Sequence, residues 1–444
     1  MADRVPWVQR LGLGRREQRA WAMYDWANSA FVTTVVAALL PVYYSDVAAS
    51  HLPNEVATAY WGYSSAIALG VVAILSPSLG AMADYLGAKK HFLAVFLGFG
   101  VTFTALLYFV GEGQWALASF LFIVAYIGFS GANVFYEALL PSIALDSELD
   151  QVSTAGFAIG YLGGGILLAM NAIWFLFPEA FGFADGGAAV RASFLSVAVW
   201  WALFSVPLFR RVPEPSRRLV ESEAEGMNPI QVGFSRVWKT LHEIRGHRDL
   251  FFFLLAFLVY NDGVGTIVKM ASIYGVEVGI GRGHLIGALL LVQFAGVPFT
   301  FGFGRFATRV SQKTAIYLCL VVYTGVAALG YFMTTAWQFW VLALAVAVVQ
   351  GGVSGLSRSV YASMIPAGRA TEFFGFYSVS SKLAGIAGPL VFGVVGQSTG
   401  SSRFGILSLV GFFVVGGVLL TRVDIGAGRR AARQDEESMA EVTG

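Results

Sequence analysis

The chain has 444 residues, of which 57% are hydrophobic and only 13% are charged, and its formal net charge is +2. Soluble domains carry about 25% charged residues, whereas runs such as FFFLLAFLVY and WVLALAVAVV are apolar on every side of a helix. This composition excludes a large soluble core and predicts an integral membrane protein. Scattered basic residues and a single cysteine, Cys319, predict neither a nucleic-acid-binding surface nor an intrachain disulfide.

Twelve apolar runs are long enough to cross a hydrocarbon layer of ~30 Å, which takes about 20 helical residues. Six spans are predicted in the first half, at 20–45, 57–83, 90–111, 114–140, 152–176 and 189–209. Six more are predicted in the second half, at 249–276, 283–304, 313–333, 336–360, 373–396 and 403–422. The first run is too long for a signal-peptide core and has no obvious cleavage site, so we expect it to be retained.

The hydrophilic segments divide the chain into five parts. They are an N-terminal segment at 1–19, a six-helix half at 20–209, a central loop at 210–248, a second six-helix half at 249–422 and a tail at 423–444. The N-terminus, the even-numbered connections and the tail hold 24 of the 29 Lys and Arg residues, whereas the opposite side holds Arg191, Arg282 and Arg403. The positive-inside rule therefore predicts that both termini and the central loop are cytoplasmic.

The two halves resemble each other in sequence. Span 4 ends with YEALLP at 136–141 and span 10 ends with YASMIP at 361–366, with the same spacing between the tyrosine and the proline. Two related six-helix halves are the architecture of many secondary transporters, in which the substrate site lies near the midplane between the halves. We therefore expect two pseudo-repeats with a binding site between them.

Several motifs resemble those of known transporters. GAMADYLGAKK at 80–90 resembles the loop motif between helices 2 and 3 of the major facilitator superfamily, although Tyr85 and Ala88 replace expected basic residues. YDWANSAF, FYEALLP, YNDGVGT and QGGVSGLSRSVYASMIP resemble the vacuole amino-acid effluxer family of that superfamily and its bacterial relatives. The resemblance covers about residues 20–422. It implies twelve helices, alternating access and export of small solutes such as neutral amino acids.

Six ionisable side chains lie within the spans or at their edges, namely Asp25, Glu137, Asp262, Lys269, Arg358 and Lys382. A charge at the centre of an inserted helix costs about 2.5–3.5 kcal/mol, so we do not expect these side chains to face lipid. Pairing between the three acids and the three bases, or protonation of a carboxyl group, would lower that cost.

Helical spacing places the polar residues of each span on one face. In the superfamily that the sequence resembles, spans 1, 4, 7 and 10 line the central cavity. We therefore predict a substrate and coupling site formed by Asp25, Asn28, Asn133, Asp262, Thr266, Lys269, Gln350 and Lys382. For each of these residues a role in helix packing is the alternative, and for Lys269 the alternative includes an interfacial position of its ammonium group.

A second set of residues is predicted to control the conformation. Glu137 and Arg358 lie near the cytoplasmic ends of spans 4 and 10, where we expect a gate that closes when the halves meet, with a role in capping the helices as the alternative. Asp84, Lys89 and Lys90 are expected to brace the state that is closed on the inside and open on the outside.

The sequence thus predicts an all-α membrane protein with the major facilitator fold that works as a secondary active transporter by alternating access. Amino acids are the expected solutes, and protons are the candidate coupling ion, with a change of protonation at Asp262. The alternatives are an exporter of another small organic solute or drug, and a non-transporting membrane sensor or enzyme.

No cluster of residues has convincing catalytic, nucleotide-binding or metal-binding spacing, so we expect no catalytic residue, metal or cofactor. The expected partners are a small solute, the lipid bilayer and, as candidates, protons, with no nucleic acid. We expect a monomer in a bacterial cytoplasmic membrane.

Overall fold

The computed structural model describes residue 9, residues 11–215 and residues 247–443, together with residues 228, 231–232, 235, 238–240 and 242. Most of the predicted N-terminal segment upstream of residue 11 and most of the predicted central loop therefore lie outside the described residues. Within the described residues, twelve helical spans are long and apolar enough to cross a membrane. The prediction of twelve spans in two six-helix halves is confirmed.

The N-terminal half contains spans 1 to 6. Span 1 joins α2 (Arg16–Ala30), a π-helical stretch (Phe31–Leu39), α3 (Leu40–Tyr43) and a second π-helical stretch (Tyr44–Ala48). The other spans are α4 (Asn54–Leu86), α5 (Lys89–Leu106), α6 (Trp115–Glu137), α8 (Leu149–Leu176) and α9 (Gly186–Arg211), and the short α7 (Leu140–Ile143) follows α6. Three-residue and four-residue 3₁₀ turns lie at Leu107–Phe109 and Pro178–Phe181.

The C-terminal half contains spans 7 to 12. Four are single helices, α11 (Arg248–Glu277), α12 (Arg282–Arg309), α13 (Gln312–Tyr331) and α14 (Ala336–Ser363). A 3₁₀ turn (Ala367–Arg369) leads into span 11, which consists of α15 (Ala370–Leu383) and α16 (Ala387–Thr399). Span 12 consists of α17 (Ser402–Ser408) and α18 (Val410–Thr421), and α19 (Ile425–Thr443) follows it.

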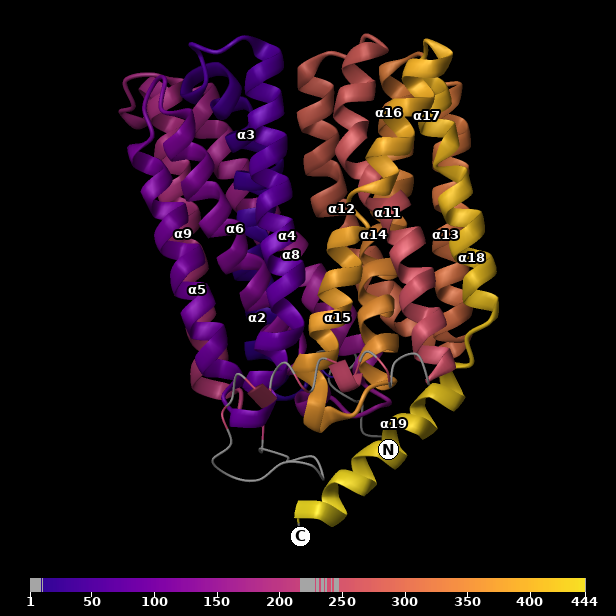
Figure 1. The fold of residues 1–444 in the computed structure, drawn as a ribbon. Coiled ribbons are helices and arrows are strands. Elements are labelled where there is room, and N and C mark those ends of the chain that lie inside the picture. Colours follow the sequence, from indigo (N-terminus) through magenta and orange to yellow (C-terminus); the bar gives the residue numbers. More distant parts are fainter. Residues whose placement is uncertain are drawn as a thin grey trace, which may run out of the picture.

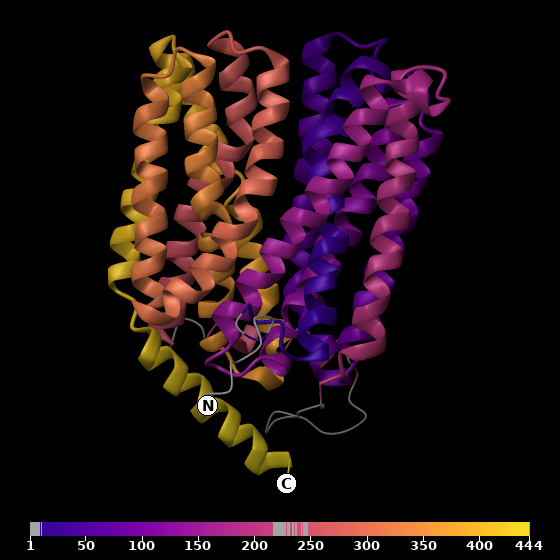
Figure 2. The same cartoon turned by 180° about the vertical axis from the view of Figure 1, so that it is seen from behind.

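The two halves stand side by side, and the described chain begins and ends on the same side of the bundle (Figure 1). We call this side the terminal face and the opposite side the far face. Viewed from the front and from behind, the ribbons of the two halves approach each other toward the terminal face and diverge toward the far face (Figure 2). The halves pack chiefly through two pairs of spans, α4 against α15 and α8 against α12, and α8 also packs against α14.

Glycines allow the two halves to approach closely at both of these contacts. A β-carbon at Gly80 of α4 would overlap the backbone of Thr371 in α15, and one at Gly375 of α15 would lie 2.6 Å from Cα of Pro77. In the other pair, a β-carbon at Gly304 of α12 would overlap the hydroxyl of Thr154 in α8. Small residues at helix interfaces permit this backbone approach in membranes.

Span 11 differs from the continuous helix that its hydropathy predicts, because it is broken at residues 384–386. Pro389 has no N–H to donate, and its ring clashes with a helical carbonyl four residues earlier, at Gly385. The N–H of Gly388, left free at the start of α16, instead donates to Oδ2 of Asp262 in α11 over 2.9 Å. The break therefore has a polar partner inside the bundle.

The C-terminal helix α19 lies along the terminal face (Figure 1). Arg429 donates to Ser363 Oγ over 3.1 Å and to Gln312 Oε1 over 2.8 Å, which fastens α19 to its own half. One helical turn later, Arg433 Nη2 lies 2.5 Å from Asp146 Oδ2 in the α7–α8 loop of the N-terminal half. The helix therefore connects the two halves on this face.

Candidate solute cavity and gate

A cavity of about 380 Å³ lies between the two halves. Its walls come from spans 1, 4 and 5 of the N-terminal half and from spans 7, 8, 9, 10 and 12 of the C-terminal half. Cavities that hold small ligands usually measure about 300–1,000 Å³. The size and the position between the halves are therefore suited to one small solute.

The polar residues of the cavity gather mainly at its end toward the terminal face. They are Asp25, Asn28 and Ser29 of α2, Asn133 and Glu137 of α6 and Arg358 of α14. Asn28 Nδ2 donates to Asn133 Oδ1 over 3.0 Å, which joins spans 1 and 4 beneath the cavity. Farther from this floor, Gln293 of α12 and Gln350 of α14 add two amide groups.

The remaining wall is predominantly apolar and extends toward the far face. Its members include Val32, Phe129, Phe157, Ile267, Leu289, Val292, Leu342 and Val346. The lining continues to Leu285 near the start of α12, to Gly330 at the end of α13 and to Phe339 near the start of α14. All three positions lie at the far-face ends of their helices, so the cavity reaches that face while its polar floor lies near the other.

Arg358 forms the floor by crossing from the C-terminal half into the N-terminal half. Its Nη2 lies 3.3 Å from Oδ2 of Asp25. The same nitrogen donates to the carbonyl of Ser153 over 2.8 Å, and Nε donates to Ser153 Oγ over 2.9 Å. Only 1% of Arg358 and 7% of Asp25 is exposed, so this ion pair is buried. Removing one partner of a buried ion pair leaves an uncompensated buried charge, which is strongly destabilising. Because the two partners belong to different halves, the pair is stable only while the halves are docked at this point.

Aromatic rings and one glycine complete the surroundings of this guanidinium. Its Cζ lies 4.2 Å from the ring centroid of Phe157 and 4.7 Å from that of Trp21, distances typical of cation–π contacts. A β-carbon at Gly156 would overlap the carboxylate of Asp25 and lie 3.0 Å from Arg358 Nη2. Glycine at this position therefore leaves the space in which the ion pair forms.

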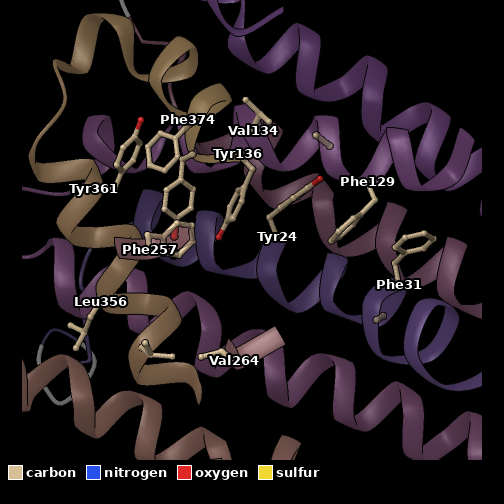
Figure 3. Close-up of a cluster of buried hydrophobic side chains, with 14 of the residues drawn as sticks. Tyr24, Phe31, Phe129, Val134, Tyr136, Phe257, Val264, Leu356, Tyr361 and Phe374 are labelled. Carbon is tan, nitrogen blue, oxygen red and sulfur yellow. The ribbon is translucent and has the colours of Figure 1, made fainter. Parts of the chain in front are cut away.

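Buried aromatic side chains from both halves, among them Tyr136 and Tyr361, lie near one another (Figure 3). Tyr136 stacks at 4.6 Å between ring centroids on Trp21, and it lies at the same distance from Tyr24. On the other half, Tyr377 stacks on Phe257 at 4.4 Å and on Tyr361 at 4.9 Å. These buried rings leave little space between the cavity and the terminal face.

Further polar contacts join the halves on the terminal side. Asp84 of α4 pairs with Lys89 Nζ at 2.9 Å and accepts the N–H of Glu372, in the first turn of α15, over 2.8 Å. A carboxylate at a helix N-terminus is stabilised by the free N–H groups and the helix dipole there. Asp150 of α8 accepts from Ser359 of α14 and, over 2.8 Å, from Gln312 Nε2 of α13. This face is therefore closed in the structure.

Six of the sequence-predicted site residues line the cavity, namely Asp25, Asn28, Asn133, Glu137, Gln350 and Arg358. Asp84 and Lys89 lie at the contact between the halves, as described above. Lys90 instead acts within the N-terminal half, where its Nζ donates to the carbonyls of Phe209 and Val212 over 2.9 and 2.7 Å. That contact ties the start of α5 to the end of α9.

Asp262, Thr266 and Lys269 share one face of α11, as their spacing indicates, but they face the break in span 11 and are not among the cavity-lining residues. Thr266 Oγ donates to the carbonyl of Asp262 over 2.7 Å. A β-carbon at Gly385 would lie 3.0 Å from Lys269 Nζ. The carboxylate thus lies at the N-terminus of α16 and the ammonium near the C-terminus of α15, which are the helix ends that favour these charges.

The sequence assigned both Glu137 and Arg358 to a gate, and the structure pairs Arg358 with Asp25. Neither the Glu137 carboxylate nor the Lys382 ammonium lies within ion-pair distance of a described residue. Lys382 nevertheless attracts Glu137 electrostatically across the contact between the halves. Lys382 Nζ lies 5.8 Å from the ring centroid of Tyr126 in α6, so its side chain crosses toward the N-terminal half.

The sequence reasoning missed three contributors to this site. Ser153 lies in the first turns of α8 and binds Arg358, but a lone serine near a helix start gives no signal of this role. Phe157 looked like an ordinary apolar residue. Gln293 could have been found, because it is a lone amide in the apolar run LIGALLLVQFAGV. Within the described residues, no group of three or more His, Cys, Asp or Glu residues is placed to hold a metal ion.

Residues 13–433 match the family model described as vacuole effluxer Atg22 like. An uncharacterized MFS-type transporter of Bacillus subtilis (strain 168), YxiO, is 40% identical over 410 residues, which cover 92% of this chain and 95% of that protein. Autophagy-related protein 22-1 of Phaeosphaeria nodorum is 24% identical over 446 residues, which cover 86% of this chain and 78% of that protein.

Solved structures with the same fold include two transporters. The human organic anion transporter MFSD10 superposes with a TM-score of 0.70 at 15% identity, over 91% of this chain and 99% of that chain. The proton:xylose symporter XylE, bound to 6-bromo-6-deoxy-D-glucose, superposes with a TM-score of 0.68 at 12% identity, over 93% of this chain and 94% of that chain. At these identities the likeness concerns the fold.

Proposed function

The chain belongs to the vacuole effluxer Atg22-like family of MFS-type transporters, and on this premise we propose that it carries small amphipathic solutes, amino acids among them, by alternating access. It is a multi-pass integral membrane protein. Both halves that form the cavity belong to one chain, so we infer that a monomer is the working unit.

The amphipathic cavity is the observation that carries this proposal. One end offers carboxylate, guanidinium and amide groups, through Asp25, Glu137, Arg358 and the two asparagines Asn28 and Asn133, whereas the wall beyond is apolar. An amino acid with an apolar side chain has the same division, with both of its charges at one end. The apolar wall also supports the second candidate, an exporter of another amphipathic organic solute.

Because the terminal face is closed and the cavity reaches the far face, the orientation of the chain in the membrane decides to which side the cavity opens. We infer from the distribution of Lys and Arg that the terminal face is cytoplasmic, in a bacterial membrane like that of the Bacillus relative. The cavity then faces outward, and the buried pair between Arg358 and Asp25 is the lock that must open before solute can pass to or from the cytoplasm. Asp84 and Asp150 support the same closed state.

Proton coupling through Asp262 remains a prediction from the sequence. Its carboxylate accepts the N–H of Gly388, and Asp262 is 1% exposed, so a proton would compete with the backbone contact that holds the start of α16. Coupling at this residue would therefore act on the break in span 11 and not by direct contact with a solute in the cavity.

Purified protein reconstituted into proteoliposomes tests the proposal. A thermal-shift screen against amino acids, nucleosides, sugars and lipids first identifies solutes that stabilise the folded protein. We expect radiolabelled L-leucine, or another solute from the screen, to exchange across the vesicle membrane without chemical change. Conversion of the solute in detergent, or failure of every stabilising solute to cross the vesicle membrane, would contradict a transport function.

Orientation is tested separately. Epitope tags at the N-terminus and at the C-terminus should be digested by protease in inside-out membrane vesicles and protected in intact cells treated from outside. The reverse pattern would place the closed face outside and contradict an outward-facing cavity.

A further inference from the structure

The carboxylates of the spans differ in whether they have a partner. Most of them are occupied by cations, hydroxyls or backbone N–H groups, namely Asp25 by Arg358, Asp84 by Lys89, Asp150 by Gln312, Asp262 by Gly388 and Glu372 by Arg369. Glu137 is different. It lines the cavity, and no described residue lies within hydrogen-bond or ion-pair distance of its carboxylate. Glu137 is half-buried in the cavity wall, so its carboxylate is free to bind a ligand there.

Charged groups surround the Glu137 carboxylate without touching it. Arg358 and Lys382 act on it from the C-terminal half, and Asp25 acts on it with the same sign. The tyrosines Tyr136 and Tyr377 also face it, one from each half. Burial and the Asp25 carboxylate favour the protonated carboxyl group, whereas the two cations favour the carboxylate, so both forms have support in these surroundings. Arg358, however, already uses Nη2 on Asp25 and the Ser153 carbonyl, and Nε on Ser153 Oγ.

A second acceptor without a partner lies in the wall of the same cavity. Gln350 Oε1 is buried and has no hydrogen-bond partner, and the side chain belongs to the cavity lining. The wall of the cavity therefore contains two acceptors that lack donors, the half-buried Glu137 carboxylate and the Gln350 amide oxygen, which is covered. An ammonium group carries three N–H donors and no acceptor, which is the complement of such a surface.

We propose that Glu137 is the cation-binding group of the cavity, and that a proton and the ammonium group of a solute occupy it in turn. This inference rests on the proposed transport function. The protonated carboxyl group is neutral and attracts an ammonium only weakly. Release of the proton to solvent restores the carboxylate, which then binds the ammonium through charge-assisted hydrogen bonds. Mutually exclusive binding at one carboxylate links solute movement to proton movement in opposite directions.

Three probes of the same carbon skeleton separate the contribution of each charge. L-leucine has both charges, 3-methylbutylamine has only the ammonium, and 4-methylpentanoate has only the carboxylate. Thermal stabilisation of the purified protein is measured for each probe over a range of pH. For the wild type we expect L-leucine and the amine to stabilise the protein, and both effects to weaken as the pH falls, because protons compete for the carboxylate.

Glu137→Gln should weaken the apparent affinity for the amine by about 10- to 100-fold, the effect expected for loss of one charge-assisted hydrogen bond, and should remove its pH dependence. Glu137→Asp retains the charge and should retain the pH dependence, which separates loss of the carboxylate from misfolding. Glu179→Gln is the matched control, because that exposed side chain lies in the turn Pro178–Phe181 outside the cavity lining, and it should leave the amine titration pH-dependent.

Infrared spectroscopy gives a readout that does not depend on any solute. The C=O stretch of a protonated carboxyl group that appears on acidification should be reduced in Glu137→Gln and retained in Glu137→Asp. The proposal is overturned if Glu137→Gln retains the wild-type pH dependence for the amine or the wild-type infrared change. Failure of proteoliposomes to move any stabilising solute, with Glu137-dependent binding of the amine intact, would instead contradict the transport function and leave the cation site standing.

Discussion

Neutralising Asp25 should open the terminal face. In Asp25→Asn the Arg358 guanidinium keeps its contacts with Ser153 but loses its buried counter-ion. Two unit charges 3.3 Å apart attract each other by about 5 kcal/mol at an effective dielectric constant of about 20. Part of this energy is recovered when the halves separate and the ions become hydrated, so we take the net loss as about 1.5–3 kcal/mol, the usual value for a charged hydrogen bond. That loss corresponds to a shift of about 10- to 100-fold toward the open terminal face.

Cysteine labelling measures this shift in a background of Cys319→Ala, which removes the buried native thiol. Thr371→Cys reports on the terminal side, because Thr371 is fully buried where α15 meets α4. Val268→Cys reports on the cavity, whose wall includes this residue at 36% exposure. In Asp25→Asn we expect thiol reagents to react faster at residue 371 and more slowly at residue 268. Unchanged rates at both positions would refute the role of the ion pair as a lock, whereas the exchange Asp25→Arg with Arg358→Asp should restore part of the wild-type pattern.

Three further changes test other contacts. Gly156→Ala places a methyl group where the Asp25 carboxylate lies, so it should raise labelling at the terminal side about as much as removing the ion pair does. Gly388→Ala places a methyl group 2.6 Å from Oδ1 of Asp262 at the break in span 11. It should lower the free energy of unfolding of the purified protein by about 1–3 kcal/mol, the usual cost of overpacking. Arg433→Glu should weaken the connection between α19 and Asp146 and raise terminal-side labelling less than tenfold, because the pair is exposed; the effect should shrink at high salt.

Matched controls exist for each change. A β-carbon at Gly98 in α5 or at Gly393 in α16 would meet no atom within 4 Å, so Gly98→Ala and Gly393→Ala should leave labelling and stability nearly unchanged. If these controls behave like Gly156→Ala and Gly388→Ala, the close contacts do not explain the effects. For the surface pair, the exchange of charges between Arg433 and Asp146 should recover the wild-type labelling rate. If Arg433→Glu alone is labelled at the wild-type rate, α19 does not restrain the halves.

Sequence periodicity and hydropathy were sufficient for the architecture. A span must bury about 20 residues in hydrocarbon, so runs such as the one that became α14 are visible without any knowledge of their neighbours. The spacing of Asp25 with Asn28, and of Asn133 with Glu137, also indicated correctly which residues would share a wall, because neighbours on a helix face are a local property.

The pairing of charges could not be obtained in this way. Asp25 and Arg358 are separated by 333 positions in the chain, and whether the guanidinium meets Asp25 or Glu137 depends on how the halves dock, on the space that Gly156 leaves and on the hydroxyl of Ser153. Sequence alone assigned Asp262 to proton coupling and Glu137 to the gate, without showing the surroundings of either carboxylate. Only the tertiary structure distinguished them, because the break in span 11 supplies a backbone N–H to Asp262 and leaves the carboxylate of Glu137 facing the cavity without a donor.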